Sequence, residues 1–200
     1  MKKLFIIGGM GAGKSTVRKA LVEQGIPYID LDKVGHDVLL WPTVKEELVE
    51  AFGEDILDEN GEVSRPALAV KAFANAAETR KLNRITLPRI EEAYTEKIAE
   101  LEKENHAAVV IEYSVFKNRF SSFAYDADIV IAVLAPLDMR IERAVKSGWD
   151  EADVRCRIAQ QITDADRIEA ADVVFNNAGS PEEIRNEVLA WWADYKKEIA

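Results

Sequence analysis

The chain has 200 residues, of which 48% are hydrophobic, enough for a sizeable core in one domain with a small insertion. Its net charge of −10 argues against a general nucleic-acid binder or a protein that binds anionic membranes, because both use basic surfaces. A single cysteine, Cys156, excludes an internal disulfide, and no apolar run approaches the length of a membrane span. We therefore expect a soluble, cytoplasmic protein, monomeric or a small homo-oligomer, with Cys156 as a passive packing residue.

Short apolar runs alternate with helical patterns along the chain, which is typical of an α/β protein with a parallel sheet and helices on both faces. Five nearly continuous apolar runs predict the strands Leu4–Ile7, Tyr28–Leu31, Ala108–Tyr113, Ile129–Leu134 and Val173–Phe175. A helix is predicted after the first strand, over Lys14–Gln24. An apolar stripe from Ile184 to Ile199, which includes the pair Trp191 and Trp192, predicts a last helix packed on the core.

The segment Gly8–Ser15 lies between the first strand and the first helix and reads GGMGAGKS, a complete match to the phosphate-binding pattern G-x-x-x-x-G-K-[ST]. Glycines let backbone N–H groups approach phosphate closely, and the following helix directs its positive end at the same anion. Lys14 is expected to reach the β- and γ-phosphates of ATP, and Ser15 to ligate Mg²⁺. The predicted nucleotide-binding residues of this loop are Gly9, Gly11, Ala12, Gly13, Lys14, Ser15 and Thr16.

Two aspartates, Asp30 and Asp32, stand at the end of the second predicted strand. Transfer of a phosphoryl group to a hydroxyl needs a group that orients and deprotonates the acceptor. Alternation along a strand places both carboxylates on one side, and we expect this strand to lie beside the phosphate loop. Asp32 is the predicted general base, with Asp30 as a second candidate. The alternative is that one of them caps a helix starting near Lys33.

Further polar residues have two open interpretations each. Glu112 ends the third strand and is either a carboxylate for the Mg²⁺ shell or a charge at the sheet edge. His36 is either a substrate contact or a surface histidine, and it shares a helix face with Asp32 only if a helix has already begun there. Four arginines after the fourth strand are expected to supply a phosphate clamp or a solvated helix face: Arg140, Arg143, Arg155 and Arg157.

Two segments exceed what a simple α/β core needs. The connection between the second and third strands is long and helical, and residues 33–105 are predicted to form an insertion near the carboxyl edge of the sheet, where such proteins bind ligands. Residues 140–165, with Ser147–Glu151 at their centre, are predicted to form a small lid.

The sequence resembles the dephospho-coenzyme A kinases over most of its length, from Ile6 to Trp191. The phosphate loop is shared by many families, whereas the combination of motifs is much more specific. The family's patterns include I-D-x-D, R-x-x-L, R-I-x-x-Q and A-D-x-V. The segments that match are Gly8–Thr16, Tyr28–His36, Phe52–Leu68, Phe73–Ile90, Arg157–Gln161, Ala171–Val174 and Asn176–Gly179.

The resemblance implies a P-loop kinase fold and ATP-dependent phosphorylation of the ribose 3′-hydroxyl of dephospho-CoA, the last step of CoA synthesis. Asp32 then matches the general base, and His36 and Arg65 fall on the acceptor side. Asn177 falls near the adenine of ATP. Residues 33–105 become the acceptor-binding helical insertion, and the lid supplies Arg143.

Several positions depart from the family pattern, and they cluster around the acceptor and the lid. Leu87 replaces a histidine before the proline of the long helix, and Lys117 replaces a glutamate after the third strand. The family's second lid arginine is absent near Lys146 and Ser147, where Lys146 is a partial substitute, and Asn176 replaces an aspartate. Two alternatives therefore stay open: a small-molecule P-loop kinase for a nucleoside, nucleotide or sugar acid, and a nucleotide-binding switch with little transfer activity.

Overall fold

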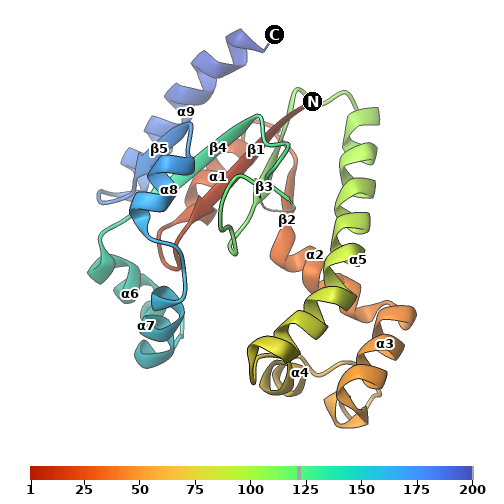
Figure 1. Cartoon of the computed structure of the whole chain (residues 1–200). Helices are drawn as coiled ribbons and strands as arrows, with labels where there is room; N and C mark the ends of the chain where they lie inside the picture. Colours follow the sequence, from red (N-terminus) through yellow and green to blue (C-terminus); the bar gives the residue numbers. More distant parts are fainter. Residues whose placement is uncertain (121–122, 200) are drawn as a thin grey trace. The chain divides into compact units, whose positions relative to one another are not determined.

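The computed structural model describes residues 1–120 and 123–199, and it combines a central sheet with helices from several parts of the chain (Figure 1). In chain order the elements are β1 (Lys2–Gly8), α1 (Lys14–Val22), β2 (Tyr28–Asp30), α2 (Leu31–Asp37), η1 (Val38–Leu40), α3 (Pro42–Phe52), η2 (Glu54–Ile56), α4 (Arg65–Ala72), α5 (Ala76–Lys103), β3 (Ala108–Glu112), β4 (Ile129–Leu134), α6 (Leu137–Lys146), α7 (Glu151–Ala159), α8 (Asp164–Ala170), β5 (Val173–Asn176) and α9 (Pro181–Glu198).

The five strands form one parallel sheet in the order β2-β3-β1-β4-β5. The predicted fold class, an α/β protein with a five-stranded parallel sheet, is confirmed. The expected position of the second strand is wrong, because β3 lies between β2 and β1. In the strand register, Ile6 of β1 pairs with Glu112 of β3, and Glu112 pairs with Asp30 of β2. These three residues therefore lie side by side across three neighbouring strands.

The end of β2 also differs from the prediction. The strand stops at Asp30, and α2 begins at Leu31, so Asp32 lies in the first turn of a helix. The alternation argument that placed Asp30 and Asp32 on one side of a strand therefore does not apply. Because α2 continues to Asp37, Asp32 and His36 are four residues apart on one helix face, and both are exposed.

The two faces of the sheet are covered by different elements. Leu4 and Ile6 of β1 join a core that includes Val17 of α1 and Val188 and Trp192 of α9, all buried. Phe5, which points to the opposite face, packs edge to face against Tyr113 at 6.4 Å between ring centroids. Helix α8 contacts β1 and β4.

The predicted helix over residues 184–199 with core tryptophans is confirmed: Trp192 is buried, and Trp191 stacks on Tyr195.

Helices α7, α8 and α9 begin at side chains that satisfy free backbone N–H groups. Ser180 caps α9 in a capping box with Glu183, and Thr163 caps α8 in the same way with Asp166. Asp150 accepts from the N–H groups of two residues at the start of α7. These local signals fix where the last three helices of the chain start.

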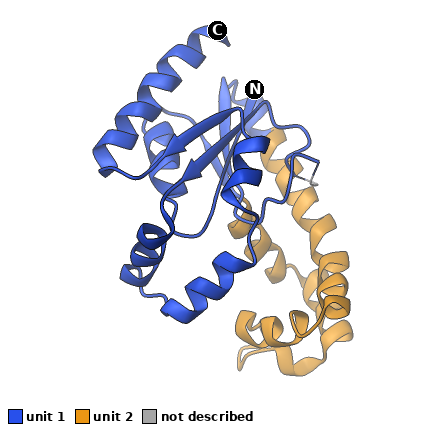
Figure 2. Cartoon of the chain, turned by 60° about the vertical axis from the view of Figure 1, so that its left-hand side comes forward, with its two compact units in different colours: residues 1–30, 100–200 blue, residues 31–99 orange. Residues whose placement is uncertain are grey.

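The chain forms two compact units, residues 1–30 with 100–200 and residues 31–99 (Figure 2). The first contains the sheet. The second, which we name the helical unit, is built from α2, α3, α4 and most of α5 with the short helices between them. It has its own core of buried residues: Val44, Leu48, Phe52, Ile56, Leu68 and Ala72.

Cys156 does not pack in a core. It is exposed on α7, where the Gln160 side-chain amide donates to its Sγ at 3.5 Å, so the prediction of a packing residue is wrong. Its position on the solvent face of a short amphipathic helix overrides the usual burial of free cysteine. Among residues 1–120 and 123–199, no helix has the length and apolar composition needed to span a bilayer.

Candidate active site

The loop between β1 and α1 has the geometry that a phosphate ligand needs. Gly13 takes a left-handed φ of 98° directly before α1, so that the N-terminus of this helix adjoins the loop. Gly9 is required for space, because a Cβ there would overlap the Arg140 guanidinium. Both positions explain why the sequence carries glycine and no larger residue.

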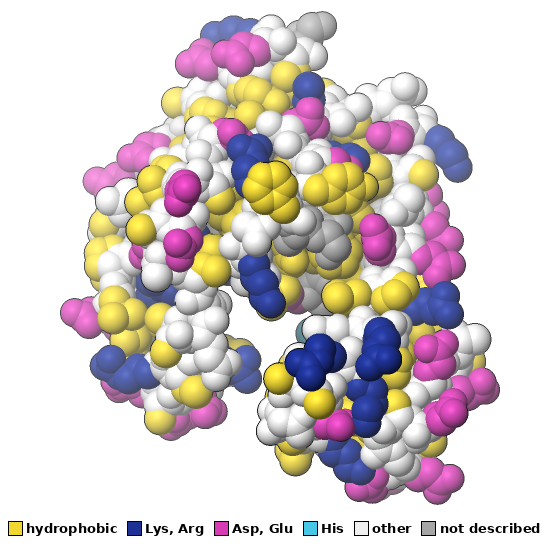
Figure 3. All heavy atoms as spheres, viewed as in Figure 1, with side chains coloured by type: hydrophobic (Ala, Val, Ile, Leu, Met, Phe, Trp, Pro, Cys, Tyr) yellow, Lys and Arg dark blue, Asp and Glu magenta, His cyan; other side chains and the backbone are white. Residues whose placement is uncertain are grey.

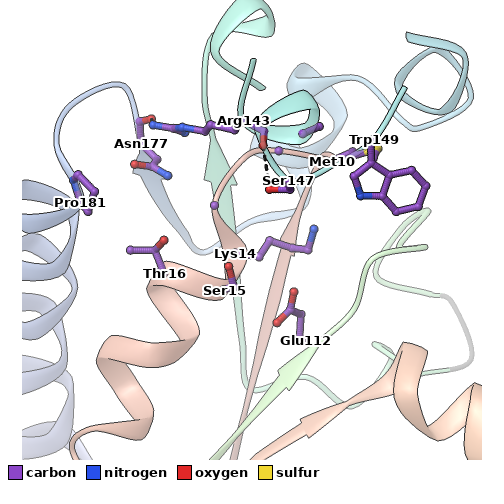
Figure 4. A pocket seen from close by; sticks show the side chains of 13 residues that line it. Met10, Lys14, Ser15, Thr16, Glu112, Arg143, Ser147, Trp149, Asn177 and Pro181 are labelled. Carbon is purple, nitrogen blue, oxygen red and sulfur yellow. Dashed lines mark hydrogen bonds between the residues drawn. The ribbon is translucent and has the colours of Figure 1, made fainter. Parts of the chain in front are cut away.

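A cavity of about 320 Å³ opens at this loop, and all of its lining residues belong to the sheet-containing unit (Figure 4). It is lined by Met10, Gly11, Gly13, Lys14, Ser15, Thr16, Glu112, Arg143, Ala144, Ser147, Trp149, Asn177 and Pro181. Most of the predicted nucleotide-binding residues thus meet in one space. Two do not line it: Gly9, which contacts Arg140, and Ala12, which is fully buried beneath the loop.

Lys14, Ser15 and Thr16 form the first turn of α1 at the cavity wall. The Lys14 ammonium donates to the carbonyl oxygens of Gly8 at 3.2 Å and Gly9 at 3.5 Å, which holds the cation at the mouth of the loop. A cation, two hydroxyls and a helix N-terminus together favour a polyphosphate.

Arg143 of α6 and Asn177 after β5 meet on one side of the cavity (Figure 4). The Arg143 Nη2 donates to the Asn177 carbonyl oxygen at 3.1 Å, while its Nη1 is buried without a hydrogen-bond partner. A buried guanidinium nitrogen without an acceptor is costly, and an anion in the cavity would satisfy it. The Asn177 side chain is buried and donates to the Ala12 carbonyl oxygen at 2.8 Å, so it also supports the loop.

The other three arginines after β4 have partners elsewhere. Arg140 does not line the cavity; it is 5% exposed behind the phosphate loop, where its Nε donates to the Met10 carbonyl oxygen at 3.0 Å. Burial lowers the pKa of Arg140, and Asp164 at 3.5 Å opposes this effect. Arg155 pairs with Glu151 of its own helix, and Arg157 lies over the Trp149 ring at 4.8 Å. Arg143 is therefore the arginine of this group that reaches the cavity.

Glu112 lines the cavity but carries an ion pair. The Arg18 Nε donates to its carboxylate at 2.9 Å, and the Arg18 guanidinium also lies over the Tyr28 ring at 4.4 Å. A bound cation would have to compete with Arg18 for this carboxylate. In the described part of the chain, no group of three or more His, Cys, Asp or Glu side chains is arranged to hold a metal ion.

The helical unit carries the residues expected on the acceptor side. Arg65 begins α4 directly after its cap Ser64, and Leu87 lies on α5; both are exposed. Figure 3 shows lysine and arginine side chains gathered over α4 and the first half of α5. The exposed arginines of this surface that form no ion pair within residues 1–120 and 123–199 are Arg65, Arg80 and Arg84.

The family model and the relatives found by sequence agree on one family. The family model described as dephospho-CoA kinase matches residues 4–183. The chain belongs to the dephospho-CoA kinase family. A dephospho-CoA kinase of Corynebacterium efficiens is 40% identical over 187 residues, which cover 92% of each chain. This family of kinases uses ATP and transfers a phosphoryl group to an alcohol, so the predicted kinase activity is confirmed and the two alternatives are not favoured.

Solved structures show the same fold. A Thermus thermophilus protein is 27% identical, with a TM-score of 0.81 over 96% of this chain and 97% of its own. A dephospho-CoA kinase from Campylobacter jejuni is 24% identical with a TM-score of 0.74, and the match covers 100% of both chains. At this identity the second match supports the fold alone.

Several residues of the site were not predicted from the sequence, among them Trp149 and Gln161. Trp149 lines the cavity from the turn between α6 and α7, and its neighbour Ser147 donates to the Arg143 carbonyl oxygen at 2.9 Å. Gln161 contacts the phosphate loop from the segment between α7 and α8. The family motif R-I-x-x-Q contains Gln161, but a motif does not say what its side chain contacts.

Proposed function

We propose that this chain transfers the γ-phosphoryl group of ATP to the ribose 3′-hydroxyl of dephospho-CoA and releases CoA and ADP. The observation that carries the proposal is the cavity in which Lys14, Ser15, Thr16 and Arg143 meet at the N-terminus of α1. Membership of the dephospho-CoA kinase family supports the choice of acceptor.

The phosphate loop binds the polyphosphate of ATP. Backbone N–H groups of the loop and the dipole of α1 attract the phosphates, and Lys14 offsets the charge that develops on the γ-phosphoryl group. Arg143 donates its free Nη1 to a phosphate oxygen, which satisfies a nitrogen that is otherwise buried without a partner. Asn177 and Pro181 line the cavity beside Thr16, and we place the adenosine of ATP on this side.

Magnesium fits the donor set as a partner of ATP. Mg²⁺ prefers oxygen ligands and keeps several waters, so a hydroxyl and phosphate oxygens suffice. The Ser15 hydroxyl lines the cavity next to Lys14 and is the protein ligand that we propose. When bound, the ion neutralises part of the phosphate charge. Glu112 contributes at most through a water while Arg18 holds its carboxylate.

Asp32 is the proposed general base. It accepts the proton of the 3′-hydroxyl as the oxygen attacks the γ-phosphorus, and ADP leaves with the electrons of the broken P–O bond. Its place in the first turn of α2, exposed and two residues after β2 ends, leaves the carboxylate accessible to an acceptor. His36, one turn further along the same face, is proposed to contact that acceptor.

The helical unit, with residues 33–105 as the predicted insertion, is proposed to bind the rest of the acceptor. Dephospho-CoA carries a pyrophosphate, and arginines bind phosphate oxygens in bidentate pairs. Arg65, Arg80 and Arg84 are exposed and form no ion pair among the described residues, so they are available for such an anion. Residues 140–165 are proposed to act as the lid over ATP.

The acidic composition supports dissolved small-molecule substrates rather than nucleic acid or membranes as partners. We propose that the chain acts in the cytoplasm as a monomer or a small homo-oligomer.

A panel of acceptors tests the proposal. The purified chain is incubated with Mg-ATP and, in separate reactions, dephospho-CoA, deoxynucleosides, nucleoside monophosphates or gluconate, and ADP release is followed. We expect turnover on dephospho-CoA alone. Faster turnover on another acceptor would assign the chain to that substrate. Tight binding of ATP with no turnover on any acceptor would favour a nucleotide-binding switch.

A further inference from the structure

Three side chains from distant parts of the sequence hold the backbone of the phosphate loop. The Met10 N–H donates to the Gln161 Oε1 at 3.0 Å, and the Met10 carbonyl oxygen accepts from the Arg140 Nε at 3.0 Å. The Ala12 carbonyl oxygen accepts from the Asn177 Nδ2 at 2.8 Å. Both backbone polar groups of Met10, which itself lines the cavity, are thus fixed.

Gln161 stands where the lid segment rejoins the core. It follows α7 by two residues and precedes α8 by three. Its Oε1 also accepts from the Arg140 Nη2 at 3.4 Å, and Arg140 in turn pairs with Asp164 in the first turn of α8. One side-chain oxygen therefore connects the end of the lid, a buried arginine and the phosphate loop.

We propose that Gln161 is a positioning residue for nucleotide binding. Its Oε1 fixes the Met10 N–H and so holds the loop in the shape that presents its following N–H groups to phosphate before ATP binds. A loop that is already ordered loses less conformational entropy on binding, so the fixed geometry favours the nucleotide. This inference rests on the proposed function only in that the loop binds the phosphates of ATP.

The chain offers a matched pair of glutamines for the test. Gln161→Met keeps the length of the side chain and removes the acceptor oxygen, while Gln161→Asn keeps the amide and shortens its reach. Gln161→Glu restores an acceptor oxygen at the same distance. The neighbouring Gln160 is exposed, and its side-chain amide donates to the Cys156 Sγ of α7, so Gln160→Met is the control.

The experiment measures the dissociation constant of Mg-ADP by calorimetry for each variant. Steady-state kinetics, the melting temperature and the hydrogen exchange of the peptide that contains residues 8–14 are measured on the same proteins. We expect Gln161→Met and Gln161→Asn to weaken ADP binding about tenfold or more, the effect of one lost hydrogen bond to a buried group, and to speed exchange of the loop amides. The KM for dephospho-CoA should stay within about twofold of the wild-type value, since the substitution changes none of the residues proposed to bind the acceptor. Gln161→Glu should recover most of the affinity, and Gln160→Met should bind ADP as the wild type does.

A purely structural role for Gln161 predicts a different pattern: a lower melting temperature with unchanged ADP affinity and unchanged loop exchange in the folded protein. That result, or wild-type ADP affinity in both folded Gln161→Asn and Gln161→Met, would overturn the proposal. ADP binding needs no acceptor. If the wild-type protein binds ADP but does not phosphorylate dephospho-CoA, the proposed function fails and the comparison of the two glutamines still decides the role of Gln161.

Discussion

The phosphate loop and the helical unit differ in how their polar groups are satisfied. The loop backbone is held by Arg140, Gln161 and Asn177 through hydrogen bonds of 2.8–3.0 Å. The helical unit closes an apolar core, and several of its arginines remain exposed without ion pairs among the described residues. The phosphate loop is therefore ordered before a ligand binds, whereas the helical unit, the proposed acceptor side, keeps charges that a ligand would pair.

Because of this difference, we expect substitutions in the phosphate loop and in the helical unit to separate nucleotide affinity, catalytic rate and acceptor affinity. The largest expected effect is that of Asp32→Asn. Loss of the general base should lower kcat about 10²–10⁴-fold while the dissociation constant of Mg-ADP is unchanged. Single-turnover kinetics with saturating ATP and dephospho-CoA measure it. If Asp30→Asn shows this loss and Asp32→Asn does not, the base is Asp30.

Lys14→Met tests the nucleotide side. Removing the cation that offsets charge on the γ-phosphoryl group should lower kcat about 10²–10³-fold and also weaken ATP binding. Lys19→Met, an exposed lysine in the last turn of the same helix, is the control and should leave both quantities near wild type. Equal, small effects of the two substitutions would remove Lys14 from the mechanism.

Arg65→Ala tests whether the helical unit binds the acceptor, as we propose. Loss of a charge-assisted hydrogen bond to a phosphate should raise the KM for dephospho-CoA about tenfold and leave the KM for ATP unchanged. The matched control is Arg89→Ala, because Arg89 already pairs with Glu47 and Glu92 of its own unit. An unchanged KM for dephospho-CoA in Arg65→Ala would place the acceptor phosphates elsewhere.

The smallest effect concerns stability away from both sites. Burial raises the pKa of Asp128, but hydrogen bonds from the Lys2 ammonium at 2.7 Å and the Lys3 N–H at 2.8 Å outweigh it and lower the pKa below the usual value. A lowered folded-state pKa stabilises the protein above the unfolded pKa, and that stability is lost as pH falls through the folded pKa.

Asp128→Asn should therefore lower the free energy of unfolding by about 1 kcal/mol at pH 7. The difference from wild type should shrink below pH ~4, near the ordinary pKa of aspartate. Denaturant titrations at pH 7 and at acid pH measure it, with the exposed pair of Asp194 and Lys197 as the control site. A constant difference across pH would mean that the Asp128 carboxylate is not its source.

The fold and the phosphate loop could be predicted because their signals are local: a run of apolar residues, eight residues of a motif, and a helix after them. Strand order could not, since every buried parallel strand has the same apolar pattern. Asp32 was misplaced on a strand because the boundary of a three-residue strand depends on the helix that follows it.

The sequence also could not predict which of two arginines three positions apart would line the cavity. Arg140 and Arg143 lie near each other on α6, yet one is buried behind the loop and the other lines the cavity. Which arginine is buried and which lines the cavity depends on how α6 packs in the tertiary structure. Gln161 shows the same limit, because its partner Met10 is 151 residues away in the chain.

The most direct test of the account is the identity of the product. Dephospho-CoA is incubated with the wild-type protein and Mg-ATP, and the product is examined by ³¹P NMR and fragmentation mass spectrometry. We predict one new phosphomonoester on the ribose 3′-oxygen, formed in equal amount with ADP. A phosphate at another oxygen, or ADP formed without a phosphorylated acceptor, would contradict the account.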